Sequence, residues 1–381
     1  MRLKSLKLIN FRNYEEATIE FSPGINILVG NNGSGKTNIL EGIYVLSLTK
    51  SNRYGKDEDL ININANNLSI TGEVVYDDYI KEYQVLMDKF TKRVYINHFQ
   101  VKKIANYISN FCITSFLPND IEIIKGSPSI RRNLLNIQIG QLYNHYLKYV
   151  NEYNSLLKIR NEYLKRLYIN SFADFKYLEV INQKMLDVSL KIYYFRFFYL
   201  ENINNILPGI YRKLSGKSSL KIEYFNNIGL SFYDEEQIKE TLISKWKKNL
   251  NKEMQQGMTL TGLHRDDLIF LIDGKDARTF ASQGQQRLIV IAYKIAELLV
   301  FKKIKGEYPV LLLDDVFSEI DIKRRNNIIK YLKQDMQVII TTTDILDINE
   351  DLVNSAKVFS IKNGKITKKG GVKNARRKNK N

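Results

Sequence analysis

The chain has 381 residues, with 58 Lys and Arg against 41 Asp and Glu, and a formal net charge of +17. This length allows two or three domains, or one large domain with an insertion. The single cysteine, Cys112, excludes an internal disulfide, a zinc–thiolate cluster and an iron–sulfur centre, and it favours a reducing compartment. The chain starts without a signal-peptide pattern and has no run of about 18 apolar residues, so we expect a cytoplasmic protein that does not span a membrane. The positive charge alone fits either a nucleic-acid partner or an ordinary solvated surface.

The first hundred residues are rich in strand signals. Short β-prone runs, broken by Gly, Asn and Asp, occupy residues 2–11, 25–29, 68–76, 79–88 and 92–98. One helix is expected within residues 33–48, where apolar side chains recur at helical spacing.

The middle of the chain is helical. Residues 129–207 contain no proline, and Leu, Ile and Tyr recur there at steps of three and four. The pattern predicts a short coiled hairpin or a helical subdomain, and it is far too short for a long coiled-coil arm. A strand-like passage at 219–232 and a helix near 235–254 follow.

Beyond Gly257 strands and helices alternate again. Strands are expected at residues 268–273, 308–315 and 336–343, and helices at 287–301 and 322–334. The expected central strands are continuously apolar, which is typical of a sheet covered on both faces. We therefore expect an α/β body built from both chain ends, with a helical insertion between them.

The strongest motif is a phosphate loop. The segment Gly-Asn-Asn-Gly-Ser-Gly-Lys-Thr matches G-x-x-x-x-G-K-[ST] and lies directly between an expected strand and an expected helix. We expect its backbone N–H groups to bind ATP, with Lys36 reaching the β- and γ-phosphates and Thr37 ligating Mg²⁺. The residues of this predicted site are Gly30, Asn31, Asn32, Gly33, Ser34, Gly35, Lys36 and Thr37.

A second motif supplies the carboxylates that such a site requires. Four apolar residues, Val310–Leu313, are followed by Asp314 and Asp315. We expect Asp314 to hold Mg²⁺ and Asp315 to polarise the attacking water, which makes Asp315 and Lys36 the predicted catalytic pair.

A third motif, Ser-Gln-Gly-Gln-Gln-Arg at residues 282–287, resembles the signature motif of the ABC ATPases. Ser282 would cap the following helix, and Gly284 would allow close backbone approach. In that superfamily this surface binds the γ-phosphate held by the opposite subunit. The resemblance therefore assigns Ser282, Gly284 and Gln285 to ATP and implies an ATP-dependent homodimer, whereas the string by itself fits a capped surface helix equally well.

Smaller features follow the same pattern. Residues 318–321 have the spacing of an ABC D-loop, and Thr343 and Asp344 stand where transporters carry a switch histidine. No clear Q-loop is present, so Asn119 or Asp120 would have to serve.

Six segments resemble, in chain order, the RecF family of bacterial recombination proteins. They are residues 6–14, 30–44, 115–136, 262–268, 282–287 and 311–321, and together they span nearly the whole chain. One departure is Leu263, which stands where the family usually has proline. The insertion is far too short for an SMC protein.

The resemblance implies an α/β fold, an ABC-type ATPase head with a helical second lobe inserted between the phosphate loop and the signature motif. The expected head, lobe I, comprises residues 1–115 and 257–360, the expected helical lobe II comprises 116–256, and residues 361–381 would form a basic disordered tail. Residues 357–381 hold ten Lys or Arg and no acid, which leaves only about +7 on the rest of the chain.

The family further implies a function in recombinational repair and replication-gap processing. ATP-driven dimerisation would grip duplex DNA or single-strand/duplex junctions, and slow, DNA-stimulated ATP hydrolysis would release it. RecR and RecO would be partners in loading the recombinase, and the protein would support the SOS response. A motor or transporter-type ABC ATPase subunit is the alternative, and a nuclease is a third, for which we find no additional carboxylate or histidine cluster.

Several side chains have two interpretations. Arg12 and Asn13 would lie near the nucleotide, although an exposed Arg after a strand is often merely solvated. His264, Arg265 and Asp267 fit either an interface beside the site or an internal polar network. Candidate DNA contacts, each with an ordinary surface position as the alternative, are Arg131, Arg132, Lys368, Lys369, Arg376 and Arg377.

Overall fold

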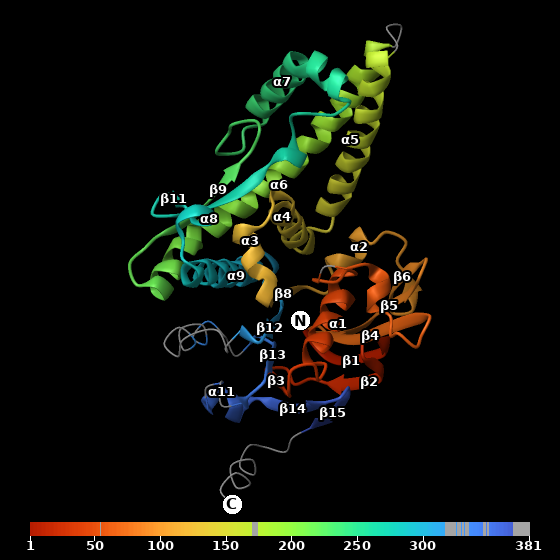
Figure 1. The fold of residues 1–381 in the computed structure, drawn as a ribbon, viewed down its shortest axis with the longest axis vertical. Helices are drawn as coiled ribbons and strands as arrows, with labels where there is room; N and C mark the ends of the chain where they lie inside the picture. The colour runs from red at the N-terminus through yellow and green to blue at the C-terminus, as the bar shows by residue number, and fades with distance from the viewer. Residues whose placement is uncertain are drawn as a thin grey trace, which may run out of the picture. The chain divides into compact units, whose positions relative to one another are not determined.

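The structure is a computed structural model in two compact units (Figure 1). Unit 1 comprises residues 1–120 and 294–381, and unit 2 comprises residues 121–293. The residues that the structure describes are 1–53, 55–169, 174–316, 325, 329, 331, 335–345, 348 and 350–368.

A largely parallel sheet forms the centre of unit 1. Its order is β15-β14-β3-β13-β12-β8, and all neighbours pair in parallel except the β14–β15 hairpin. All residues of β12 and β13 are buried, as their continuous apolar sequences predict. The bounds are β3 (Ile25–Val29), β8 (Ile113–Phe116), β12 (Val310–Asp314), β13 (Val338–Thr342), β14 (Lys357–Lys362) and β15 (Lys365–Lys368).

An antiparallel sheet of order β2-β1-β4-β5-β6-β7 completes unit 1, and helix α1 (Lys36–Leu48) contacts strands of both sheets. The bounds are β1 (Arg2–Phe11), β2 (Tyr14–Glu20), β4 (Asn67–Val75), β5 (Ile80–Asp88), β6 (Lys92–Ile96) and β7 (Phe99–Gln100). Short helices lie at η1 (Asp57–Leu60), α2 (Ala105–Ile108), η2 (Pro118–Ile121) and α11 (Glu350–Ser355). The sequence did not predict β2, whose three glutamates obscure its alternation of buried and exposed residues.

Unit 2 is mainly helical, with α5 and α6 packed along one another and α7 against both. Its helices are α3 (Glu122–Lys125), α4 (Pro128–Leu142), α5 (Tyr146–Ile169), α6 (Phe175–Ser215), α7 (Glu235–Gln256), η3 (Leu263–Arg265) and α8 (Ala277–Phe280). A sheet of order β11-β10-β9 joins β9 (Leu220–Phe225), β10 (Asp267–Ile272) and β11 (Lys275–Asp276). Helix α9 (Gln283–Lys305) begins in unit 2 and ends in unit 1.

Three boundaries differ from the sequence expectation. Unit 2 begins at residue 121 instead of 116. Unit 2 extends to Tyr293 instead of ending at residue 256, because β10 pairs with β9. The basic tail expected from residue 361 does not begin there, because Ile361 is fully buried in β14 and residues 365–368 pair with β14 as β15. Residues 369–381 lie outside the described part of the chain.

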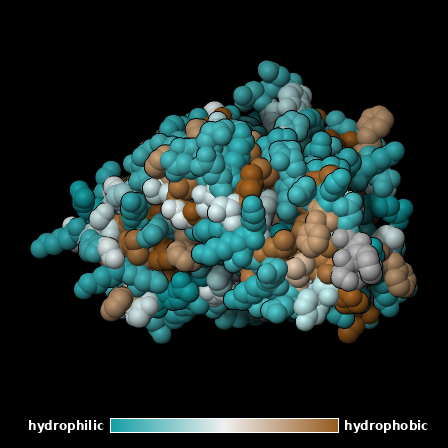
Figure 2. Space-filling view, turned by 90° about the horizontal axis from the view of Figure 1, so that it is seen from above, coloured by the Kyte–Doolittle hydropathy of each residue, from teal (hydrophilic) through white to brown (hydrophobic). Residues whose placement is uncertain are grey.

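One face of the molecule is mostly polar (Figure 2). Figure 2 shows one face on which hydrophilic side chains predominate and hydrophobic ones form small separate patches. Within the described residues, no helix combines the length and the apolar character needed to cross a bilayer.

Candidate nucleotide-binding site

The phosphate loop connects β3 to α1, as the motif predicts. Gly33 and Gly35 have φ values of 77° and 108°, which side chains rarely tolerate. A Cβ on Gly35 would lie 2.5 Å from the Tyr14 hydroxyl oxygen, and that hydroxyl donates a hydrogen bond to the Gly35 carbonyl at 3.0 Å. A Cβ on Gly30 would collide with the carbonyl oxygen of Ile361. The loop therefore requires glycine where neighbouring strands approach its backbone.

Lys36 and Ser34 fit a phosphate ligand. Lys36 is 6% exposed, and its Nζ donates to the carbonyl oxygens of Gly30 at 2.5 Å and Asn31 at 2.9 Å. Burial lowers the pKa of Lys36, while Asp315 and Asp314 act in the opposite direction. The Ser34 hydroxyl is buried and has no hydrogen-bond partner in the described part of the chain. A buried cation and an orphaned hydroxyl in one loop are the donors that a phosphate would satisfy.

Thr37 and Asp314 lie together at the start of α1 and the end of β12. The Thr37 hydroxyl donates to Asp314 Oδ1 at 2.9 Å, and Asp314 is 4% exposed. Both residues offer the oxygen ligands that Mg²⁺ prefers, and Mg²⁺ usually keeps several waters besides one or two protein ligands. These two residues fit the predicted metal role.

Thr341, on β13, organises the two aspartates and was missed by the sequence analysis. Its hydroxyl donates to Asp314 Oδ1 at 2.7 Å and accepts the backbone N–H of Asp315 at 3.0 Å. Asp315 follows β12 with a left-handed φ of 50°. The signal was present in the sheet register, because β12 and β13 are parallel and place Asp314 opposite Thr341.

Arg12 and Asn13 lie on the β1–β2 turn and contact α1. Arg12 donates to both carboxylate oxygens of Glu41, at 3.0 and 2.7 Å, and to the Asp59 carbonyl at 2.6 Å. Glu41 is 1% exposed, and Arg53 approaches it to 3.5 Å. Sequence reasoning did not identify Glu41 or Arg53. Through its bonds to Glu41, Arg12 anchors this turn on the helix that begins at Lys36.

Asn13 makes a separate contact beside the loop. Its Oδ1 accepts a hydrogen bond from Asn38 Nδ2 at 2.7 Å, and its Nδ2 lies 2.9 Å from the place where a Cβ on Gly35 would be. Asn13 therefore lies directly against the phosphate loop.

The signature segment forms an exposed helix start in unit 2. The Ser282 hydroxyl accepts the Gln285 N–H at 3.3 Å, and the Gln285 side chain accepts the Ser282 N–H at 2.9 Å, which is a capping box. Gly284 is exposed, and a Cβ there would meet no atom within 4 Å. Gln286 is buried and donates to the carbonyls of Ala277 and Ala281. Within one chain this is the capped surface helix, and its N-terminus is accessible to a ligand.

The smaller motifs have mixed outcomes. Residues 318–321, the expected D-loop, lie outside the described residues. Asp344 is exposed and Thr343 is half-buried, and the Asp344 carbonyl accepts from Thr342 Oγ1 at 2.8 Å. Asp120 accepts the Leu117 N–H at 2.8 Å, and burial raises the pKa of its carboxyl. Asn119 is exposed.

The prediction that Arg131 contacts DNA is wrong. Its side chain is 1% exposed, and its Nε and Nη2 donate to Asp267 Oδ1 at 2.6 Å and Oδ2 at 2.9 Å. Its Nη1 donates to the carbonyls of Ile123 and Gly126. A buried guanidinium with these partners has no surface to offer DNA, so Arg131 is a structural residue of unit 2.

The other basic candidates divide into three groups. Arg132 is half-buried and donates to the backbone oxygen of Asp266 at 2.8 Å. Lys368 is exposed at the end of β15. The remaining candidates, Lys369, Arg376 and Arg377, lie outside the described residues.

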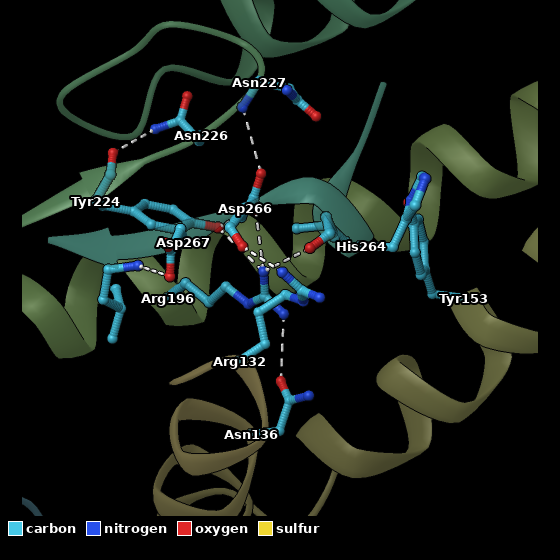
Figure 3. A network of polar contacts seen from close by, with 12 residues as sticks. Arg132, Asn136, Tyr153, Arg196, Tyr224, Asn226, Asn227, His264, Asp266 and Asp267 are labelled. Carbon is cyan, nitrogen blue, oxygen red and sulfur yellow. Dashed lines mark hydrogen bonds and ion pairs between the residues drawn. The ribbon is translucent and has the colours of Figure 1, made fainter. Parts of the chain in front are cut away.

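His264, Asp266 and Asp267 belong to an internal network of unit 2 (Figure 3). His264 Nδ1 lies 2.8 Å from the Tyr153 hydroxyl and Nε2 lies 3.0 Å from the Thr259 carbonyl, and burial lowers the pKa of His264 to about 4. Asp266 pairs with Arg196 at 3.0 Å, and burial raises the pKa of Asp266 to about 6. These contacts favour the internal-network interpretation for His264 and Asp267, while Arg265 is exposed.

Comparison with known proteins agrees with this geometry. The family described as RecF/RecN/SMC N terminal domain matches residues 2–367. The chain is 36% identical over 371 residues to the DNA replication and repair protein RecF of Staphylococcus epidermidis, covering 97% of this chain and all of that one. The chain belongs to the RecF family.

Solved structures extend the match to the fold. A structure of the recombination mediator protein RecF-ATP in the RecFOR pathway superposes on this RecF-family chain with a TM-score of 0.89, at 33% identity and 97% coverage of each chain. An Smc head, solved with the C-winged helix domain of ScpA, matches with a TM-score of 0.55 at 17% identity, over 99% of this chain and all of that one. The resemblance read from the motifs is confirmed, and the fold is an ABC-type ATPase head with an inserted helical lobe.

Proposed function

We propose that this RecF-family protein is an ATP-dependent DNA-binding protein of recombinational repair and replication-gap processing. The observation that carries the proposal is the Thr37–Asp314 contact beside the phosphate loop, in a chain that matches a repair protein along nearly its whole length. The proposal includes DNA, RecR and RecO as partners, recombinase loading and the SOS response as the setting, and the cytoplasm as the location. The matching solved structure of a recombination mediator in the RecFOR pathway supports the partners.

ATP would bind with its phosphates in the loop of residues 30–37, while Thr37 and Asp314 would hold Mg²⁺. The metal, when bound, neutralises charge on the phosphate oxygens. Lys36 Nζ would exchange the carbonyls of Gly30 and Asn31 for phosphate oxygens. Asp315, held through its backbone by Thr341, would orient a water for weak, DNA-stimulated hydrolysis.

The exposed start of α9 supports an ATP-driven homodimer. Ser282, Gly284 and Gln285 are exposed at a helix N-terminus, which is a favourable place for an anion. In the proposed dimer this surface meets the γ-phosphate bound by the second copy. ATP then shifts the population towards the closed dimer because it binds that state better than the monomer.

The closed dimer would grip duplex DNA or single-strand/duplex junctions through the phosphate backbone, without reading bases. Lys368, exposed on β15, is a candidate contact in unit 1, and the basic residues beyond it would add salt-sensitive affinity. Hydrolysis would remove the bridging phosphate and release the DNA.

A salt-dependent binding titration tests the proposal. Full-length protein is titrated onto duplex, gapped duplex and single-stranded DNA with ATP, with ADP and without nucleotide, beside Lys36→Ala as a variant without phosphate binding. We expect ATP to tighten binding to duplex-containing DNA in the wild type only. Equal affinity in all three nucleotide states would contradict the switch.

A further inference from the structure

A small polar cavity lies within unit 2, in the network of Figure 3. Its volume is about 140 Å³, and it lies among α4, α5, α6 and η3. The polar residues that line it are Arg132, Asn136, Tyr153, Asn154, Arg196 and His264. None of them belongs to the nucleotide site, and the role of this cavity is independent of the function proposed above.

The buried arginines around the cavity outnumber their carboxylates. Arg131 pairs with Asp267 at 2.6 Å, and Arg196 pairs with Asp266 at 3.0 Å. Arg132 pairs with no carboxylate among the described residues, and it donates instead to the backbone oxygen of Asp266. Burial, together with the nearby charge of Arg196, lowers the pKa of Arg132. The half-buried guanidinium of Arg132 therefore lies near the buried Arg196. The charges of Asp266 and Asp267 act against the lowering of its pKa, but each of these carboxylates is paired with another arginine.

Asn154 is exposed and Arg132 is half-buried, so donors of these two side chains are open to solvent and have no protein acceptor in the described chain. Nε and Nη2 of Arg132 have no hydrogen-bond partner within the described ranges, and neither does the Asn154 side chain. Asn136 Oδ1 already accepts from Tyr146 and Arg196, which leaves its amide N–H groups to be satisfied. The wall is thus rich in donors, and no carboxylate is among its lining residues in the described chain.

His264 adds no charge to this wall. Its Nε2 faces the Thr259 carbonyl, so Nε2 must carry the proton, and Nδ1 accepts from the Tyr153 hydroxyl. Both ring nitrogens are therefore satisfied in the neutral form. The positive charge available to a ligand comes from Arg132 and from the neighbouring Arg196.

We propose that this cavity binds a small tetrahedral oxyanion of the phosphate class through Arg132, Asn136 and Asn154. The cavity, of about 140 Å³, is large enough for an ion of this size. A guanidinium presents paired N–H donors to such an ion, and the ion supplies the missing charge. The ligand would join α4 to the N-terminal part of α5.

The test is calorimetric titration of inorganic phosphate into the full chain at constant ionic strength. Saturating AMP-PNP and Mg²⁺ occupy the phosphate loop, so that heat reports the second site alone. We expect one site in the wild type, with affinity lowered about tenfold or more by Arg132→Ala. Arg265→Ala is the matched control, since Arg265 is exposed on the adjacent η3 helix and does not line the cavity.

Two further arms make the result decisive. Asn154→Leu, at an exposed position of α5, should weaken phosphate binding even if Arg132→Ala fails to fold. Glycerol 2-phosphate distinguishes the source of the ligand: binding equal to that of phosphate assigns a phosphate ester, and binding of phosphate alone assigns the free ion. The proposal is overturned if no site is seen with AMP-PNP bound, or if Arg265→Ala weakens binding as much as Arg132→Ala and Asn154→Leu do.

Discussion

Replacing Thr341 by valine should disorganise Asp314 and Asp315 while preserving side-chain shape. The Thr341 hydroxyl is within 2.7 Å of Asp314 Oδ1 and within 3.0 Å of the Asp315 nitrogen, and the residue is 1% exposed. Hydrogen bonds to charged groups contribute about 1.5–3 kcal/mol each, and the second, neutral bond contributes less. Thr341→Val should therefore lower the free energy of unfolding by roughly 2–3 kcal/mol, measured by urea denaturation.

Turnover should fall as well, because Asp314 and Asp315 lose their common anchor. Misplacement of about 1 Å can cost on the order of 100-fold, so we expect kcat to fall by about 10- to 100-fold, with a smaller change in nucleotide affinity. Thr114→Val is the control. Thr114 is 1% exposed on β8 of the same sheet, and its hydroxyl has no hydrogen-bond partner in the described chain. If both variants matched the wild type in stability and ATPase activity, Thr341 would have no organising role.

Three other predictions concern the loop and unit 2. Gly35→Ala, at φ 108°, should abolish ATP binding in a fluorescent-nucleotide assay, whereas Gly24→Ala, with open space around it, should not. Arg131→Met should lower stability by roughly 3 kcal/mol because the buried Asp267 carboxylate loses its close partner and keeps only the 3.8 Å pair with Arg278, and unchanged thermal unfolding would refute the structural role. The lowered pKa of His264 means that the folded state resists its protonation, so stability should fall from pH 6.5 towards 4. Asp266, whose pKa is raised to about 6, changes stability in the opposite direction between about pH 4 and 6. The pH dependence of stability is therefore compared between the wild type and His264→Asn, which should lack the histidine contribution.

Local motifs were the most predictable features. The phosphate loop is one continuous segment whose glycines, lysine and threonine act through their own backbone and immediate neighbours. Strands β3, β12 and β13 were evident from continuous apolar runs, because burial on both faces removes the polar alternation.

Features that depend on distant partners were not predictable. An arginine at the start of a helix is expected at the surface, but Arg131 is paired with Asp267, which is 136 residues away in sequence. Thr341 gains its role only from the parallel register of β12 and β13. The unit boundary was misplaced for the same reason, since the pairing of β10 with β9 cannot be read from either segment alone.

The central claim is that each ATP is bridged by Lys36 of one copy and Ser282 of the other. The most direct measurement is the molar mass, by sedimentation, of Lys36→Ala protein, Ser282→Arg protein and their equal mixture with ATP. Neither variant alone should dimerise, while the mixture should, because it contains one intact composite site formed by Lys36 of one variant and Ser282 of the other. Dimerisation of either variant by itself, or no dimer in the mixture, would contradict the account.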